Sequence, residues 1–167
     1  MRVLAAAILA MLVAATPAAA TAPLPQATGE VVLTVTGAIA RTNGDGAAEF
    51  DQAMLEEIGS ARLATSTPWT DDVPEFEGVP MAALLDAVGA AGTVAVATAL
   101  DGYSVELPIA ELRTYPVLLA MRMNGEPLSV RDRGPLWVVY PRDQLPEFRD
   151  ARHDAKWIWQ LRSLEIR

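Results

Sequence analysis

The sequence of 167 residues contains no cysteine and only one histidine, His153. Without cysteine the chain forms no disulfide, so an exported form has to be held together by its hydrophobic core. Thiolate-ligated zinc and iron–sulfur sites and any thiol nucleophile are excluded as well. A single histidine cannot by itself build a histidine-rich metal site. The chemistry of this chain therefore rests on carboxylates, hydroxyls, guanidinium groups and aromatic rings.

Basic residues are also scarce, with 13 Lys and Arg against 21 Asp and Glu, which gives a net charge of −8. Such a chain is a poor nucleic-acid binder because phosphates need a basic face, and it would not favour an anionic membrane surface. The sequence also lacks a Walker loop, a dinucleotide-binding glycine fingerprint and a Gly-x-Ser-x-Gly elbow. These patterns therefore give no sign of a nucleotide-binding or serine-hydrolase site.

The first part of the chain, residues 1–20, has the pattern of a secretory signal peptide. Arg2 supplies the positive start, residues 3–15 the apolar centre and residues 18–20 the small-residue cleavage site. The apolar run is too short to span a bilayer as a mature helix, although an uncleaved anchor is the alternative. We expect export and cleavage near Ala20.

The remainder of the chain is expected to form a short tether and one domain. Residues 21–29 are rich in Pro and Ala, and residues 30–167 contain enough apolar residues for one core. Strands and short helices alternate there without a regular βαβ rhythm, which predicts an α+β fold of mixed β-sheets with short helices. Strands are expected over residues 30–36, 62–67, 93–100, 104–107, 136–140 and 157–166. Helices are expected over residues 52–58, 80–88 and 109–114, and a long irregular segment over residues 142–156. Asp51 is expected to cap the first of these helices.

A charged hairpin occupies residues 124–141. Asn124-Gly125 predicts a tight turn because both residues tolerate a positive φ. Residues 131–133, Arg-Asp-Arg, then lie on a short loop between two strands, where a small polar ligand is readily held. The alternative is a surface hairpin with solvated charges.

Five short motifs occur in an order that resembles a known family. They are Phe76-Glu77-Gly78-Val79-Pro80-Met81 followed by Leu84-Leu85, Asp101-Gly102-Tyr103, Leu119-Ala120 followed by Met123-Asn124-Gly125-Glu126-Pro127-Leu128, Gly134-Pro135-Leu136-Trp137, and Lys156-Trp157. Together they resemble the molybdopterin-binding domain of the sulfite oxidase family over nearly all of residues 30–167. The resemblance implies an α+β fold of mixed sheets whose loops hold a molybdenum–pterin cofactor.

Two departures from that family bear on its chemistry. The family binds its metal through a cysteine at the end of a strand, and the corresponding stretch here, residues 65–67, is Thr-Ser-Thr. A hydroxyl is no substitute for a thiolate as a ligand of such a metal. The family's enzymes commonly carry an arginine where this chain has Trp137. Both changes remove redox chemistry and leave a hollow suited to a flat heterocycle.

A smaller branch matches these departures. The run Arg131-Asp132-Arg133-Gly134-Pro135-Leu136-Trp137, then Tyr140-Pro141 and Trp157-Ile158-Trp159-Gln160-Leu161, resembles periplasmic pterin-binding regulators without cysteine. The resemblance implies a periplasmic, non-catalytic protein that binds a reduced pterin without molybdenum. Its expected partner is the periplasmic domain of an inner-membrane signalling protein, either a cyclic-di-GMP enzyme or a sensor kinase. The alternatives are a molybdenum-cofactor oxidoreductase with a non-cysteine ligand and an interaction protein with a vestigial pocket.

Ten residues are the candidate pterin-binding residues under this resemblance, and none is assigned a catalytic or metal-binding role. A carboxylate and a guanidinium suit the polar edge of a pterin, which favours the charged pair of the hairpin loop, and an aromatic ring suits its face. The hydroxyl at the vacated ligand position is expected on the floor of the pocket, and His153 is expected on the surface. The candidates are Thr67, Trp69, Asp101, Tyr103, Asp132, Arg133, Gly134, Trp137, Tyr140 and Trp159.

Overall fold

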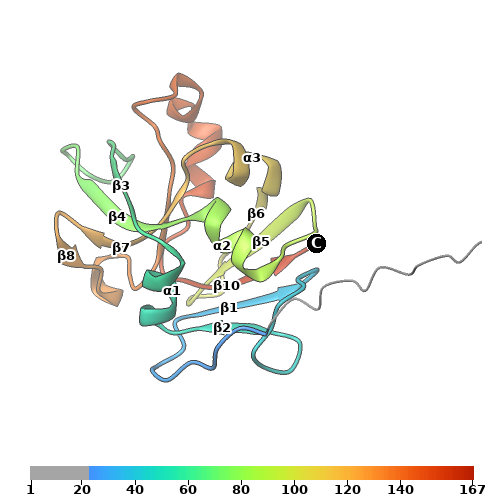
Figure 1. Cartoon of the computed structure of the whole chain (residues 1–167). Helices are drawn as coiled ribbons and strands as arrows, with labels where there is room; N and C mark the ends of the chain where they lie inside the picture. Colours follow the sequence, from blue (N-terminus) through green and yellow to red (C-terminus); the bar gives the residue numbers. More distant parts are fainter. Residues whose placement is uncertain (1–22) are drawn as a thin grey trace, which may run out of the picture.

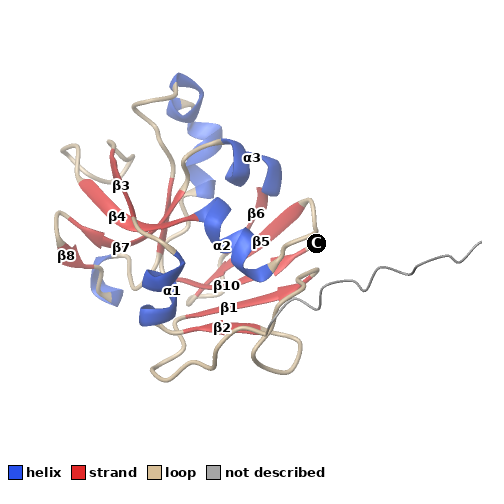
Figure 2. Cartoon of the chain, viewed as in Figure 1, coloured by secondary structure: helices blue, strands red, loops and turns tan. Residues whose placement is uncertain are grey.

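The computed structural model describes residues 23–167, which form two five-stranded β-sheets and a few short helices (Figure 1, Figure 2). The expected signal peptide and the first two residues of the expected tether lie outside the described residues. The strands are β1 Leu33–Gly37, β2 Ala48–Phe50, β3 Ala61–Ala64, β4 Glu75–Pro80, β5 Val94–Ala99, β6 Ser104–Pro108, β7 Leu118–Met123, β8 Glu126–Pro127, β9 Trp137–Val139 and β10 Leu161–Ile166. The helices are α1 Gln52–Ile58, α2 Met81–Val88, α3 Ile109–Thr114 and the 3-10 helices η1 Val130–Asp132, η2 Pro146–Arg149 and η3 Ala151–Lys156.

The first sheet has the strand order β2-β1-β10-β5-β6. Its central strand, β10, runs parallel to β1, although the two strands come from opposite ends of the domain. The other neighbouring strands in this sheet are antiparallel. The sheet is therefore mixed, and together with the short helices it confirms the predicted α+β class.

The second sheet has the order β3-β4-β7-β8, and β9 pairs with the first half of β7. Asn124 and Gly125 join β7 to β8 with φ angles of 53° and 83°, as the tight-turn prediction requires. Gly78 on β4 faces the backbone of Leu119 on β7 so closely that a Cβ atom would collide with it. The absence of a side chain at Gly78 thus allows β4 and β7 to pair.

Helix α1 connects the two sheets, because it contacts both β2 and β4. The side chain of Asp51 caps it by accepting a hydrogen bond from the backbone N–H of Met54 at 2.9 Å. The same carboxylate also accepts backbone hydrogen bonds from Thr28 and Gly29, and these three donors hold the pKa of Asp51 below its ordinary value. Residues 28 and 29, expected at the end of a tether, are therefore attached to the domain. No helix within residues 23–167 is long and apolar enough to cross a membrane.

The last third of the chain differs from the prediction. The strand expected over residues 157–166 begins only at Leu161, and the segment before it, which contains Trp157 and Trp159, is not extended strand. Trp159 forms an isolated bridge with Trp137 instead. The segment expected to be irregular contains two 3-10 helices, η2 and η3. Short 3-10 turns have no apolar periodicity of their own, so the sequence pattern did not reveal them.

Candidate functional site

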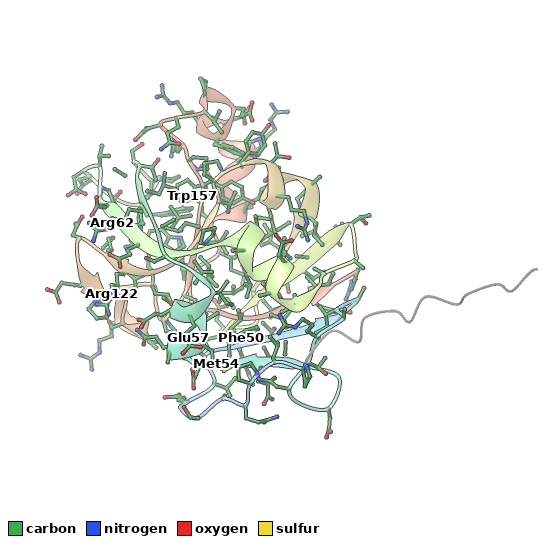
Figure 3. The ribbon with its side chains drawn as sticks, viewed as in Figure 1. Phe50, Met54, Glu57, Arg62, Arg122 and Trp157 are labelled. Carbon is green, nitrogen blue, oxygen red and sulfur yellow. The ribbon has the colours of Figure 1, made fainter. Side chains whose placement is uncertain are left out.

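A cavity of about 280 Å³ opens where the β5–β6 turn, η3 and the stretch before β10 meet. Helix η3 contacts β6, so it lies next to the strand that follows the lining turn. Figure 3 shows Trp157 within the packed side chains of the upper half of the molecule. The residues that line the cavity are Trp69, Ala99, Asp101, Tyr103, Asp154, Ala155, Trp157, Ile158 and Trp159.

All four tryptophans of the chain pack together, and three of them, Trp69, Trp157 and Trp159, line this cavity. The ring centroid of Trp69 lies 5.1 Å from that of Trp159, 6.2 Å from that of Trp157 and 6.4 Å from that of Trp137. The rings of Trp69 and Trp159 both line the cavity and are perpendicular, at 89°. They therefore form two walls at right angles, a geometry in which a flat ligand can stack on one ring and meet the other with its edge.

Asp101 and Tyr103 belong to the turn between β5 and β6 and both line the cavity. The carboxylate of Asp101 accepts a hydrogen bond from the backbone N–H of Tyr103 at 2.9 Å, which fixes the turn. The hydroxyl of Tyr103 donates to the carbonyl oxygen of Ala155 at 3.3 Å. The tyrosine, with its side chain half exposed, thus connects the turn to η3 across the mouth of the cavity.

The charged pair of the hairpin loop does not reach the cavity lining. Asp132 is exposed, and its carboxylate accepts a hydrogen bond from the hydroxyl of Ser129 at 2.6 Å. Arg133 lies behind the tryptophans: its Nη2 donates to the carbonyl oxygen of Trp69 at 3.2 Å. Its guanidinium carbon lies 5.3 Å from the ring centroid of Trp137 and 5.8 Å from that of Trp159. In this structure Arg133 supports the aromatic walls through hydrogen bonding and cation–π contact.

Three further candidates are interior residues. Trp137 is fully buried and its Nε1 donates to the carbonyl oxygen of Trp157 at 3.3 Å. Tyr140 is also fully buried, and burial together with the charge of Glu111 raises the pKa of its hydroxyl. A Cβ atom on Gly134 would collide with the backbone of Leu128. None of the three lines the cavity. The side chains of Trp137 and Tyr140 are enclosed by the core, and Gly134 allows its loop to pack closely against Leu128.

The hydroxyl run at residues 65–67 is fully engaged in protein hydrogen bonds. The Oγ1 atom of Thr67 accepts from the backbone N–H of Trp69 at 3.0 Å and lies 3.0 Å from the Oγ1 atom of Thr70. Ser66 donates twice to the carboxylate of Asp143, and Thr65 accepts from the backbone N–H of Asp143. None of these hydroxyl residues lines the cavity. Thr67 therefore orients the segment that carries Trp69 and does not form the cavity floor.

The sequence pattern did not identify Asp154, Ala155, Trp157 and Ile158 as lining residues. Trp157 belongs to two family motifs and to a predicted strand but is not among the candidate site residues. Asp154 carries no signal because the sequence predicts an irregular segment over residues 142–156. His153 is also placed differently from its prediction: its Nδ1 is buried and its ring packs edge-on against Phe148, with 5.2 Å between centroids. The physical reason is that the 3-10 turn folds this segment back onto the core.

An ion pair with little solvent exposure fixes η3 in place. Lys156 donates from Nζ to both carboxylate oxygens of Glu111 on α3, at 2.7 and 3.0 Å. The two side chains are only 18% and 15% exposed. Because Lys156 directly follows the lining residues of η3, this pair sets the position of one wall of the cavity.

A second hollow, of about 480 Å³, lies between α1 and the strands of the second sheet. Its charged residues neutralise one another: Arg62 pairs with Glu77 at 3.4 Å and Arg122 with Glu56 at 3.8 Å. Figure 3 shows Arg62 and Arg122 at the left edge of the view. No group of three or more His, Asp and Glu side chains able to hold a metal ion occurs in the described part of the chain. The tryptophan-lined cavity is therefore the candidate functional site.

Comparisons with known proteins concern the family and the fold of this chain. A search of curated proteins found no match. Among solved structures, the chain is similar to the crystal structure of the sulfane dehydrogenase SoxCD from Paracoccus pantotrophus, with a TM-score of 0.59 and 19% identity over 80% of this chain. The match covers 37% of the SoxCD chain, so this protein spans little more than a third of it, and the likeness confirms the predicted fold. The model of the oxidoreductase molybdopterin-binding domain matches residues 45–164, more than half of the chain. This chain therefore belongs to the oxidoreductase molybdopterin-binding domain family.

Proposed function

We propose that this protein is a non-catalytic pterin-binding protein that reports the state of its ligand to a membrane-bound signalling partner. The observation that carries the proposal is the cavity lined by Trp69, Trp157 and Trp159, in a family whose domain binds a pterin cofactor. Two perpendicular indole walls suit a flat heterocycle, because one ring stacks on its face while the other meets its edge.

The residues present fit the pterin part of the family's cofactor and do not fit its metal part. The lining combines aromatic rings with carboxylates and an indole N–H, which match the hydrogen-bonding edge of a pterin. The chain has no cysteine, and the hydroxyls of Thr65, Ser66 and Thr67, where the family's metal ligand is expected, are occupied by hydrogen bonds inside the protein. The cavity is thus suited to a pterin without molybdenum.

The proposed partner is the periplasmic domain of an inner-membrane protein, either a cyclic-di-GMP enzyme or a sensor kinase. Support comes from the leader pattern of residues 1–20, which would place the protein in the periplasm, and from the resemblance of residues 131–137 and 157–161 to periplasmic pterin-binding regulators. A protein that binds a pterin without catalysis needs such a partner to have an effect. The surface formed by η3 and the β5–β6 turn, next to the cavity, would be the part of the protein that the partner senses.

The second candidate is a molybdenum-cofactor-dependent oxidoreductase with a non-cysteine ligand. The match to an oxidoreductase family model favours it. It requires a hydroxyl or solvent ligand on the metal, which is a poor substitute for a thiolate. It therefore predicts stoichiometric molybdenum and dye-linked turnover in the purified protein.

The test is a titration of the exported, purified protein with dihydroneopterin, followed by tryptophan fluorescence, together with elemental analysis. We expect saturable quenching and no molybdenum. Replacing Trp69→Leu should weaken binding by about fivefold or more, because base–aromatic stacking is worth about 1–3 kcal/mol. Val73→Ala, an exposed position on the same loop, should bind like the native protein. Stoichiometric molybdenum with turnover, or no binding of any reduced pterin, would overturn the proposal.

A further inference from the structure

Within the described residues, only four buried side-chain nitrogen or oxygen atoms have no hydrogen-bond partner. One is the hydroxyl of Tyr140, and the others are Nδ1 of His153, Oδ1 of Asp154 and Nε1 of Trp157. Three of the four thus fall within five consecutive residues, on η3 and at its end. Asp154 and Trp157 also line the cavity. Because an unpaired buried polar group is unfavourable, the unpaired atoms of Asp154 and Trp157 at this cavity point to a polar ligand as their partner.

The other carboxylates near the site are already satisfied by the protein. Asp101 accepts from the backbone N–H of Tyr103, and Asp132 accepts from the hydroxyl of Ser129. Asp150, four residues before Asp154, accepts from the side chain of its neighbour Arg152. Asp154 differs from these three because its Oδ1 is buried beside the cavity and has no donor within residues 23–167.

The rigidity of η3 adds to this difference. The segment is fixed at its end by the pair of Lys156 with Glu111, and at Ala155 by the hydroxyl of Tyr103. The backbone next to Asp154 is therefore held by two contacts with other elements, which fix where this residue lies beside the cavity. A positioned acceptor that is already desolvated is typical of a ligand-recognition group.

We propose, on the basis of the function proposed above, that the carboxylate of Asp154 is the acceptor that anchors the ligand and that Nε1 of Trp157 is a donor to the same ligand. A carboxylate prefers a heterocycle edge that presents an exocyclic amino group next to a ring N–H, because both are donors. An indole N–H prefers a ring nitrogen or oxo group on the same ligand. The site thereby selects a heterocycle of the aminopyrimidinone class over one with an oxo group in place of the amino group.

Pterin and lumazine are suitable probes, because lumazine carries an oxo group where pterin carries its amino group. The native protein should bind pterin about tenfold or more tightly than lumazine, as expected for loss of a hydrogen bond to a charged group. In Asp154→Asn the affinity for pterin should fall by a similar factor, while lumazine binding should be kept or improved, because an amide also donates. Trp157→Phe should weaken both probes alike, since it removes only the shared donor.

Asp150→Asn is the matched control, because it removes a half-exposed carboxylate from the same segment, leaves a residue that still caps η3, and should leave both affinities unchanged. Far-UV circular dichroism will show whether each variant is folded, and Asp154→Ser replaces Asp154→Asn if that variant is not. If the native protein binds neither probe and no dihydroneopterin either, the proposed function itself fails. If it binds dihydroneopterin but neither probe, the role of Asp154 is overturned. If it binds pterin and lumazine equally, or if Asp154→Asn or Asp154→Ser keeps the native ratio of affinities, pterin binding stands and the role of Asp154 is overturned.

Discussion

The carboxylate of Asp143 accepts two hydrogen bonds from Ser66, one from its backbone N–H at 2.6 Å and one from its hydroxyl at 2.7 Å. The backbone N–H of Asp143 in turn donates to the hydroxyl of Thr65 at 3.2 Å. These contacts join two loops that are 77 residues apart in the chain. The hydroxyl run at residues 65–67, which the family resemblance places at the metal-ligand position, therefore serves as a structural connection beside the site.

The first prediction concerns the pH dependence of this connection. The two hydrogen bonds from Ser66 lower the pKa of Asp143 below its ordinary value. A lowered pKa in the folded state stabilises the fold above the unfolded pKa of about 4, and this stabilisation is lost as the pH falls through the folded value. Asp143→Asn should therefore lower the free energy of unfolding at neutral pH, and the gap to the native protein should narrow at about pH 3. Urea denaturation of the native protein and of Asp143→Asn at both pH values measures this difference in the free energy of unfolding.

The control for this prediction is Asp45→Asn, which removes an exposed carboxylate from a distant loop. The free energy of unfolding of that variant should differ from that of the native protein by the same small amount at both pH values. A gap between native protein and Asp143→Asn that stays constant from neutral to acidic pH would contradict the assigned role of the carboxylate.

The second prediction concerns Arg133, which supports the cavity without lining it. Arg133→Gln removes the cation–π contacts with Trp137 and Trp159 and weakens the hold on the Trp69 carbonyl. We expect the affinity for dihydroneopterin to fall about three- to tenfold, and the near-ultraviolet circular dichroism of the tryptophans to change. Arg131→Gln, on the same loop and exposed, is the control. An unchanged aromatic spectrum would show that Arg133 does not order the walls.

The third prediction concerns the pair of Lys156 with Glu111. In Lys156→Met the carboxylate of Glu111 loses its ion-pair partner while it stays largely shielded from solvent. We expect this loss to lower the free energy of unfolding by about 1–3 kcal/mol. The double variant Lys156→Met/Glu111→Leu should recover part of that loss, because the uncompensated charge is then gone. Denaturation of the two single variants and the double variant gives the coupling energy. Strict additivity of the two single effects would mean that the pair does not hold η3 in place.

The fourth prediction concerns close packing at Gly134. A Cβ atom there would meet the carbonyl group of Leu128, so Gly134→Ala should destabilise the fold by about 1–3 kcal/mol. Gly44→Ala is a matched control, because the nearest atoms to its Cβ belong to the Glu49 side chain at 3.6 Å, an ordinary contact. Thermal unfolding compares the two variants. A Gly134→Ala protein as stable as Gly44→Ala would show that the loop moves freely.

The sequence by itself determined the parts of the fold that depend on local chemistry. Asp51 predicted the start of α1 because an Asp side chain satisfies the free N–H groups of a first turn, and the structure has that hydrogen bond. Asn124-Gly125 predicted the β7–β8 turn because both residues accept positive φ. The order of the family motifs gave the α+β fold, and the structural likeness to SoxCD confirms it.

Only the tertiary structure decided which side chains face the cavity. Trp69 and Trp159 are 90 positions apart in sequence number, and only the packing of their segments brings their rings within 5.1 Å. Asp132 was a strong candidate from its residue type, yet the hydroxyl of Ser129 already satisfies it. Asp154 carried no sequence signal because a short 3-10 helix has no periodic pattern, and its burial without a partner exists only once η3 is folded against the domain.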